Sequence, residues 1–352
     1  MTARQSTFDG WVVIGFTWRR QIVVGPSSKT ARTLQIGSRC DPWLQMSSTV
    51  IGFVDWCLMV SKGTARAELV TRSDAGHSDA EMLIQESYKD VPTKAAGDGT
   101  MRIHLFHPTI AGYPHAKFPG VVVFSEIYQV TGPVARFARQ IAGQGYIVAA
   151  PSSYHEFTGP EPLAYDGPGT DAGNEWKIKK KLAAYDEDAE LSVSLLLGLK
   201  TCNGKVGATG MCLGGHLAYR CALDSRVKAA VCYFATDIHS HSLGEGKNDD
   251  SLKRAGNISG ELVMIFGKSD NHVPPEGRDL IRKTLHEVGT DFSFYEVFGA
   301  QHAFIRDELS KGRYDPAISK VCFEMLLEVF ERRLKLDLGE PSGEKLVVED
   351  VC

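Results

Sequence analysis

The chain has 352 residues, of which 43% are hydrophobic, so it can bury a full core in one domain of about 250 residues plus an extension. Its formal net charge of -4 and the lack of basic clusters interleaved with aromatics argue against a nucleic-acid-binding protein. The apolar run 50–60 is too short to span a bilayer and contains Asp55, so we expect no membrane partner.

The first 80 residues differ in composition from the remainder. Residues 1–60 carry six basic and three acidic side chains, a bias shared with organellar transit peptides. No amphipathic helix or cleavage signal is evident, so organellar import and a disordered tail stay open. We predict a poorly ordered extension over 1–80, one folded domain over 81–338 and a tail over 339–352.

Between these ends, strand-like and helix-like segments alternate. The apolar pattern predicts strands at 101–106, 121–124, 146–150, 206–210, 227–234, 262–266 and 292–297. It predicts helices near 134–142, 182–197, 215–223 and 276–288, with a closing helix over 316–334. This alternation is typical of an α/β protein with a mostly parallel twisted sheet and helices on both faces.

Two segments of this domain predict surface features. Glycines and prolines punctuate 154–174, so we expect a long loop without a long helix, typical of a substrate lid. Tyr165 and Asp166 are expected to line it or to serve as packing and turn residues. The lysine run 177–181 is interpreted as a solvated helix start.

The hexad 210–215 places Cys212 where a strand turns into a helix. Gly210 and Gly214 stand two positions on either side, as the tight strand-turn-helix geometry of a nucleophile elbow requires. The Leu213 backbone N–H would then face an oxyanion formed beside the sulfur. Taken alone, a cysteine between glycines is more often a small core residue than a nucleophile.

An acid and a histidine follow the next two strands. Asp270 comes after 261–266 and His302 after 292–298, so both are expected at the carboxyl edge of the sheet. Nucleophile, acid, histidine is the chain order of α/β-hydrolases, in which the acid orients the histidine. Taken singly, Asp270 could be a turn residue. We interpret His216 as structural and consider His272 too close to the acid to be its partner. His239 and His241 are assigned to a polar loop.

One more carboxylate, Glu126, ends the apolar strand 121–124; by itself it could be a helix cap. With it, residues 82–335 resemble the dienelactone hydrolase family, also called carboxymethylenebutenolidases. The motifs that carry the resemblance are Glu126-Ile127-Tyr128, the elbow, Asp270 before Val273-Pro274, and His302-Ala303-Phe304.

The resemblance implies an α/β-hydrolase fold and a hydrolase that opens a lactone or small ester through an acyl-cysteine. Cys212, Asp270 and His302 would be the triad, and Leu213 and Ile127 would supply the oxyanion N–H groups. Glu126 would hold the resting thiol and take its proton when substrate arrives. Arg306 matches one of two substrate-binding arginines; we find no second, and the lysines near 177 are not an equivalent clamp.

Further expectations concern cofactors, partners and alternative functions. We expect no cofactor and no metal, because the eight cysteines lack zinc-ligand spacing, and a small-molecule substrate as the main partner. We expect a monomer or small homo-oligomer in the cytoplasm. Two other functions stay open. One is a glutamine-amidotransferase-like or deglycase-like cysteine enzyme, which would usually place a histidine where Leu213 stands. The other is a non-catalytic binding or redox-sensing protein.

Overall fold

The computed structural model describes residues 83–310 and 312–336, together with four short strands nearer the start. These strands pair as a sheet of their own, in the order β1 (Arg4–Phe8), β2 (Trp11–Gly15), β3 (Met59–Ser61) and β4 (Thr64–Arg66). The chain divides into two units, Met1–His77 and Ser78–Cys352. The predicted tail over 339–352 lies outside the described residues, as does most of the segment 1–80.

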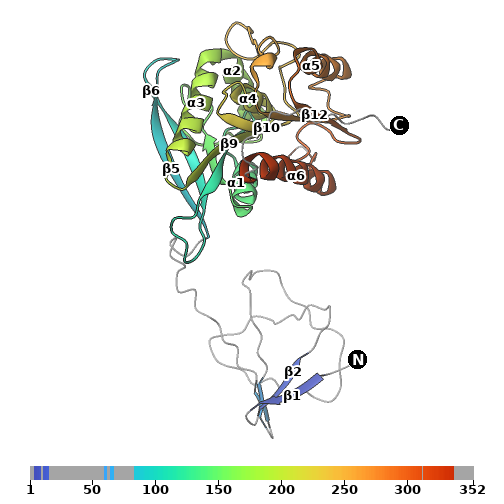
Figure 1. The fold of residues 1–352 in the computed structure, drawn as a ribbon. Helices are drawn as coiled ribbons and strands as arrows, with labels where there is room; N and C mark the ends of the chain where they lie inside the picture. Colours follow the sequence, from blue (N-terminus) through green and yellow to red (C-terminus); the bar gives the residue numbers. More distant parts are fainter. Residues whose placement is uncertain are drawn as a thin grey trace, which may run out of the picture. The chain divides into compact units, whose positions relative to one another are not determined.

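An eight-stranded sheet forms the centre of the second unit (Figure 1). Its order is β12-β11-β10-β9-β7-β8-β6-β5, with antiparallel pairs only between β5 and β6 and between β6 and β8. The bounds are β5 Ile84–Thr93, β6 Gly99–Pro108, β7 Phe118–Phe124, β8 Ile147–Pro151, β9 Cys202–Met211, β10 Val227–Tyr233, β11 Glu261–Gly267 and β12 Phe292–Val297. The predicted mostly parallel sheet is confirmed.

Strand β5 was not among the predicted strands. It pairs with β6 along its whole length, from Ile84 opposite Pro108 to Thr93 opposite Gly99. Most of its residues are exposed, so it lacks the alternation of apolar and polar residues that marks a half-buried strand. Its position is set by the pairing with β6 rather than by its own composition.

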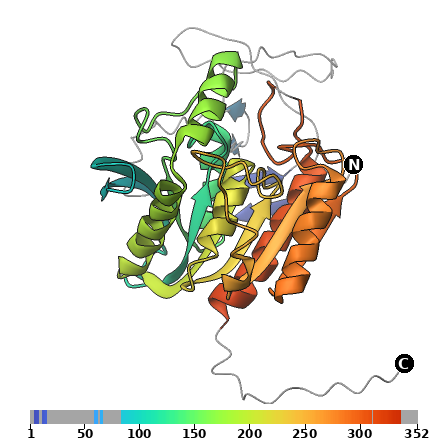
Figure 2. The same ribbon diagram turned by 90° about the horizontal axis from the view of Figure 1, so that it is seen from above.

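Helices cover both faces of the sheet, as predicted. The bounds are α1 Gly132–Gly143, α2 Gly167–Lys179, α3 Leu182–Gly198, α4 Leu213–Cys221, α5 Pro275–Val288 and α6 Pro316–Phe330, after which Glu331–Lys335 form a π-helical turn. Core residues of α1 and α6 pack on one face, and those of α3, α4 and α5 pack on the other. Figure 2 shows α3, α4 and α5 in front of the sheet. Among the described residues, no helix combines the length and apolarity needed to cross a membrane.

Helix α2 corrects the prediction that 154–174 holds no long helix. Asp166 caps it by accepting a 2.8 Å hydrogen bond from the Gly169 N–H, and Pro168 stands in the first turn, where its missing N–H costs nothing. The glycines are there for close packing, since a Cβ on Gly169 would lie 2.1 Å from the Ala164 carbonyl oxygen and one on Gly173 would lie 2.4 Å from that of Ile127. The proline and glycines that predicted a loop therefore begin this helix and let it pack closely against its neighbours.

The lysine run corrects a second prediction, because it is not a solvated helix start. Lys180 is the residue that follows α2, and its side chain is fully buried. Its ammonium lies 2.7 Å from both Asp188 and Glu156, and it donates to the Ser153 carbonyl oxygen at 3.0 Å. Lys180 thus joins the end of α2 to the protein interior, whereas Lys179 and Lys181 are exposed.

Candidate active site

Cys212 lies at the junction of β9 and α4, with backbone angles φ 60° and ψ −120°. A positive φ is uncommon for a residue with a side chain and stores strain at the turn. A Cβ on Gly214 would lie 2.1 Å from the Phe124 carbonyl oxygen, and one on Gly210 would lie 2.2 Å from that of Gly214. The two glycines therefore let α4 approach the ends of β7 and β9 closely. This is the geometry expected of a nucleophile elbow.

The Cys212 thiol is held in its neutral form. Burial raises its pKa to about 12, and the nearby charge of Glu126 adds to the increase. Lys177 and the Leu213 N–H act in the opposite direction without overcoming it. The resting sulfur is thus protonated across the physiological range.

Asp270 and His302 are brought together as predicted, in the loops after β11 and β12. The His302 Nδ1 lies 2.8 Å from the Asp270 Oδ2, and both side chains are buried. Burial alone would raise the pKa of Asp270, but hydrogen bonds from His272 and His302 hold it far below its usual value. Burial lowers the pKa of His302, and its contact with Asp270 offsets part of that change. The pair is therefore a carboxylate beside a neutral imidazole.

His272 also contacts this pair, although we considered it too close to Asp270 in the sequence to be its partner. Its backbone N–H donates to the Asp270 Oδ1 at 2.8 Å, and its ring stacks on that of His302 with centroids 4.0 Å apart. Its side chain is half exposed. His216 is buried and bonds Ser251, in agreement with a structural role.

Glu126 lies at the end of β7 and is almost completely buried. Its two oxygens accept hydrogen bonds from the Arg306 guanidinium at 3.2 Å and from the Tyr165 hydroxyl at 3.1 Å. Burial raises its pKa, and the Arg306 charge offsets part of the increase. The resemblance implied that Glu126 holds the resting Cys212 thiol. In this structure its hydrogen-bond partners are instead Arg306 and Tyr165.

Arg306 is buried and lies between an acid and aromatic rings. Its guanidinium stands 4.7 Å from the centroid of the Tyr165 ring, and its Nε lies 3.6 Å from Glu308. Tyr165 also forms a hydrogen bond with Thr131 at 2.7 Å and does not line the cavity beside Cys212. Its hydroxyl contacts Glu126 and its ring contacts the Arg306 guanidinium. Its predicted contact with substrate stays a prediction.

A cavity of about 240 Å³ joins these groups. It is lined by Glu126, Ile127, Tyr128, Thr170, Asn174, Lys177, Cys212, Thr236, Asp237, His272, His302, Arg306 and Arg313. Lys177 forms an ion pair with Asp237 at 3.0 Å. Arg313 has no acidic partner among the described residues. Sequence reasoning missed Arg313, because no motif surrounds it, and excluded Lys177 as a clamp.

Two backbone N–H groups are available to an oxyanion. Leu213 is the first residue of α4, so its N–H has no acceptor within the helix. Ile127 lies in the turn after β7 and lines the cavity, and its N–H has no backbone acceptor within the described chain. Both belong to segments that meet at the elbow, which is compatible with the predicted oxyanion hole.

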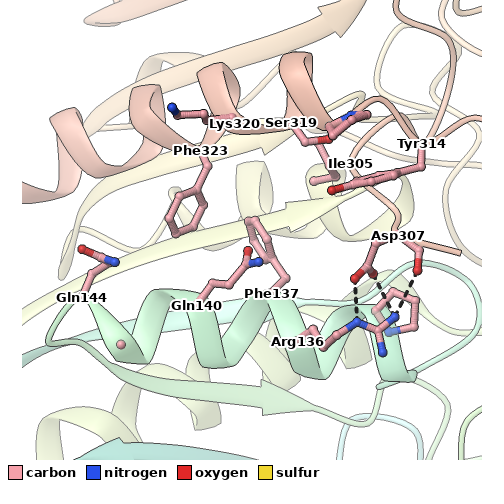
Figure 3. A pocket seen from close by; sticks show the side chains of 13 residues that line it. Arg136, Phe137, Gln140, Gln144, Ile305, Asp307, Tyr314, Ser319, Lys320 and Phe323 are labelled. Carbon is pink, nitrogen blue, oxygen red and sulfur yellow. Dashed lines mark hydrogen bonds and ion pairs between the residues drawn. The ribbon is translucent and has the colours of Figure 1, made fainter. Parts of the chain in front are cut away.

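A larger groove, about 480 Å³, lies elsewhere, between α1 and α6 (Figure 3). Phe137 of α1 and Phe323 of α6 point toward one another across it, and the bidentate ion pair of Arg136 with Asp307 lies at one end. None of its lining residues is a cysteine or histidine, so it offers neither a thiol nor an imidazole base. The chemistry is concentrated in the smaller cavity.

The sheet order and the strained elbow define an α/β-hydrolase. The chain belongs to the dienelactone hydrolase family, whose model matches residues 106–334, and it is a carboxylic ester hydrolase. A carboxymethylenebutenolidase homologue from Saccharomyces cerevisiae is 56% identical over 275 residues, which are 77% of this chain and 100% of the yeast protein. The carboxymethylenebutenolidase of Pseudomonas putida is 26% identical over 188 residues, covering 51% of this chain and 72% of that enzyme.

A solved structure agrees with this assignment at the level of the fold. The crystal structure of a dienelactone hydrolase homologue from Klebsiella pneumoniae matches with a TM-score of 0.57 and 21% identity. The match covers 70% of this chain and 99% of that protein. The fold predicted from the motifs is confirmed.

Proposed function

We propose that the protein hydrolyses a lactone or small ester carrying a carboxylate, through an acyl-cysteine formed on Cys212. The observation that carries this proposal is that the strained Cys212 elbow lines one cavity with His302, whose Nδ1 contacts the buried Asp270. A thiol needs a partner that ionises it when substrate binds, because its resting pKa is about 12.

The first half-reaction begins when the substrate carboxylate pairs with Arg306. Glu126, which loses this partner, accepts the thiol proton, and the thiolate attacks the substrate carbonyl carbon. The Leu213 and Ile127 N–H groups stabilise the oxyanion. The C–O bond of the ester then breaks, and the leaving oxygen takes the proton from Glu126.

In the second half-reaction, His302 and Asp270 activate a water that hydrolyses the acyl-cysteine. His302 Nε2 takes a proton from water while Asp270 holds the Nδ1–H and stabilises the imidazolium. The hydroxide attacks the acyl carbon, the C–S bond breaks, and the departing thiolate recovers its proton from His302. Cys212 returns to the neutral thiol from which it started.

The charges of the cavity support an anionic substrate. Three basic side chains line it, whereas Glu126 and Asp237 are its acidic ones. Lys177 is paired with Asp237, and Arg306 is paired with Glu126 until the substrate displaces it. Arg313 is therefore the second cation that can face the substrate carboxylate beside Arg306. We propose that Arg313 takes the role for which the sequence analysis found no residue.

The proposal is tested by following dienelactone absorbance and p-nitrophenyl acetate cleavage with the wild type, Cys212→Ala and Cys202→Ala. Cys202 is a buried cysteine outside the cavity and serves as the control. We expect turnover to vanish only in Cys212→Ala. Lactone turnover that survives this change in a folded protein would contradict the acyl-cysteine. A folded wild type that cleaves neither substrate would favour a binding or sensing role.

A further inference from the structure

Asp270, His272 and His302 present three metal-ligand atoms at one place. The Asp270 carboxylate lies 2.8 Å from the His302 Nδ1 and 3.5 Å from the His272 Nδ1. The two imidazole rings stack at 23° with centroids 4.0 Å apart. In these three residues, one ligand atom from each side chain lies within 4.8 Å of the other two. No other group of three or more histidine, cysteine, aspartate or glutamate side chains among the described residues meets this condition.

We propose that these three residues form an inhibitory binding site for a divalent transition metal of the Zn²⁺ type. Zinc takes imidazole nitrogen and carboxylate oxygen at about 2.0 to 2.2 Å, which in a tetrahedral site puts neighbouring ligand atoms about 3.3 Å apart. The separations of 2.8 and 3.5 Å lie on either side of that value. The two distances run to different oxygens of the Asp270 carboxylate, and the stacked rings hold their in-plane lone pairs side by side. The half-exposed His272 ring must therefore turn out of the stack to complete the site.

The cavity supplies an entry path and a fourth position. His272 and His302 both line it, and the His272 side chain is 48% exposed, so a hydrated ion can reach the buried carboxylate from this side. Water would occupy the remaining position, which is typical of an open zinc site. Arg313 lies close enough to affect His302 electrostatically and opposes a cation there. We therefore expect moderate affinity, of the order of micromolar.

Metal binding would block the proposed hydrolysis through the imidazole. The metal takes the place of the proton between His302 Nδ1 and Asp270, and that proton moves to Nε2. A protonated Nε2 has no lone pair with which to accept a proton from water. This consequence rests on the proposed function, whereas binding itself does not.

Binding is tested by calorimetric titration of the full chain with ZnCl₂. We compare the wild type with His272→Ala, and with His272→Phe, which keeps a stacked ring but removes the ligand nitrogen. His115→Ala, at an exposed histidine away from the site, is the matched control. We expect both His272 variants to bind at least about tenfold more weakly than the wild type and the control. Unchanged affinity in the His272 variants would overturn the proposal.

A Cys212→Ser variant separates this site from a thiol site. If zinc binding is lost in Cys212→Ser and kept in His272→Ala, the metal is held by the cysteine and the proposal fails. Turnover is then measured with and without ZnCl₂, each variant against its own metal-free rate. We expect inhibition of the wild type that a chelator reverses, shifted to at least about tenfold higher zinc in His272→Ala. Zinc binding without inhibition would overturn the inhibitory role while leaving the site itself in place.

Discussion

The protonated state of Cys212 is the residue-scale property that most affects reactivity. Because its pKa is raised to about 12, the reactive thiolate fraction should grow about tenfold per pH unit across the neutral and mildly alkaline range. We therefore expect iodoacetamide to alkylate the free enzyme slowly at pH 7.5, with a rate that rises through pH 10 without a plateau. A plateau near pH 8 or 9 would contradict the buried neutral thiol.

Glu126 offers a way to separate resting reactivity from catalysis. Its charge is one cause of the raised pKa of Cys212, so Glu126→Gln should speed alkylation of the resting thiol. If Glu126 is also the base of the first half-reaction, the same variant should lose turnover by about 10² to 10⁴-fold. Parallel loss of both rates would show that Glu126 instead supports the thiolate.

The proposed role of His302 predicts the acid side of the pH profile. In the proposed mechanism the neutral imidazole is the base of the second half-reaction, and burial lowers its pKa below the ordinary 6.5, so protonation begins only at more acidic pH. We expect kcat, measured with an ester for which hydrolysis of the acyl-cysteine limits turnover, to fall on acidification with a midpoint below 6.5. The check is a pH series with a neutral ester, whose own ionisation cannot contribute. A midpoint at or above 6.5 would contradict this prediction.

At the scale of elements, Lys180 ties the end of α2 to α3. Replacing it with methionine would leave Asp188 and Glu156 as buried carboxylates without their cation. We expect Lys180→Met to lower the free energy of unfolding by about 3 to 5 kcal/mol in urea denaturation. Lys179→Met removes an exposed pair with Glu175 one position away and should change stability by about 1 kcal/mol or less. Similar effects of the two variants would argue against the buried cluster.

The elbow depends on space that only glycine leaves. A Cβ on Gly214 would meet the backbone of Phe124 at 2.1 Å, so Gly214→Ala must displace α4 or β7. We expect destabilisation of at least about 1 to 3 kcal/mol, with turnover lost even in the folded fraction. Gly198→Ala, in α3, meets nothing within 4 Å and should be neutral or stabilising by up to about 1 kcal/mol. Thermal unfolding followed by circular dichroism would measure both changes.

The elements also show which features a sequence can reveal. The elbow and the Asp270 and His302 loops were predictable, because each depends on residues that are adjacent in the chain. The start of α2 was not, since its glycines are explained by contacts with Ala164 and Ile127 that only the folded chain makes. The burial of Lys180 likewise depends on Asp188, which the run of lysines does not reveal.

At the scale of the molecule, every residue of the proposed site belongs to the unit Ser78–Cys352. We propose that this unit is the catalytic domain. A chain that begins at Ser78 should therefore keep kcat/KM within about twofold of the full chain, as expected of a domain with its own core. Loss of activity in a folded, shortened protein would show that residues 1–77 take part in catalysis.

The eight-stranded sheet of this unit ends at β5, a long strand whose outer side pairs with no other strand of the described residues. Glu86 and Asp90 of this strand form ion pairs with Arg139 and Arg102, and Pro92 has no N–H to offer. A second chain that added a strand here would have to desolvate these charged side chains, and it would find no backbone N–H donor at Pro92. The exposed edge is thus poorly suited to accept a foreign strand, which protects the enzyme from edge-to-edge aggregation at high concentration.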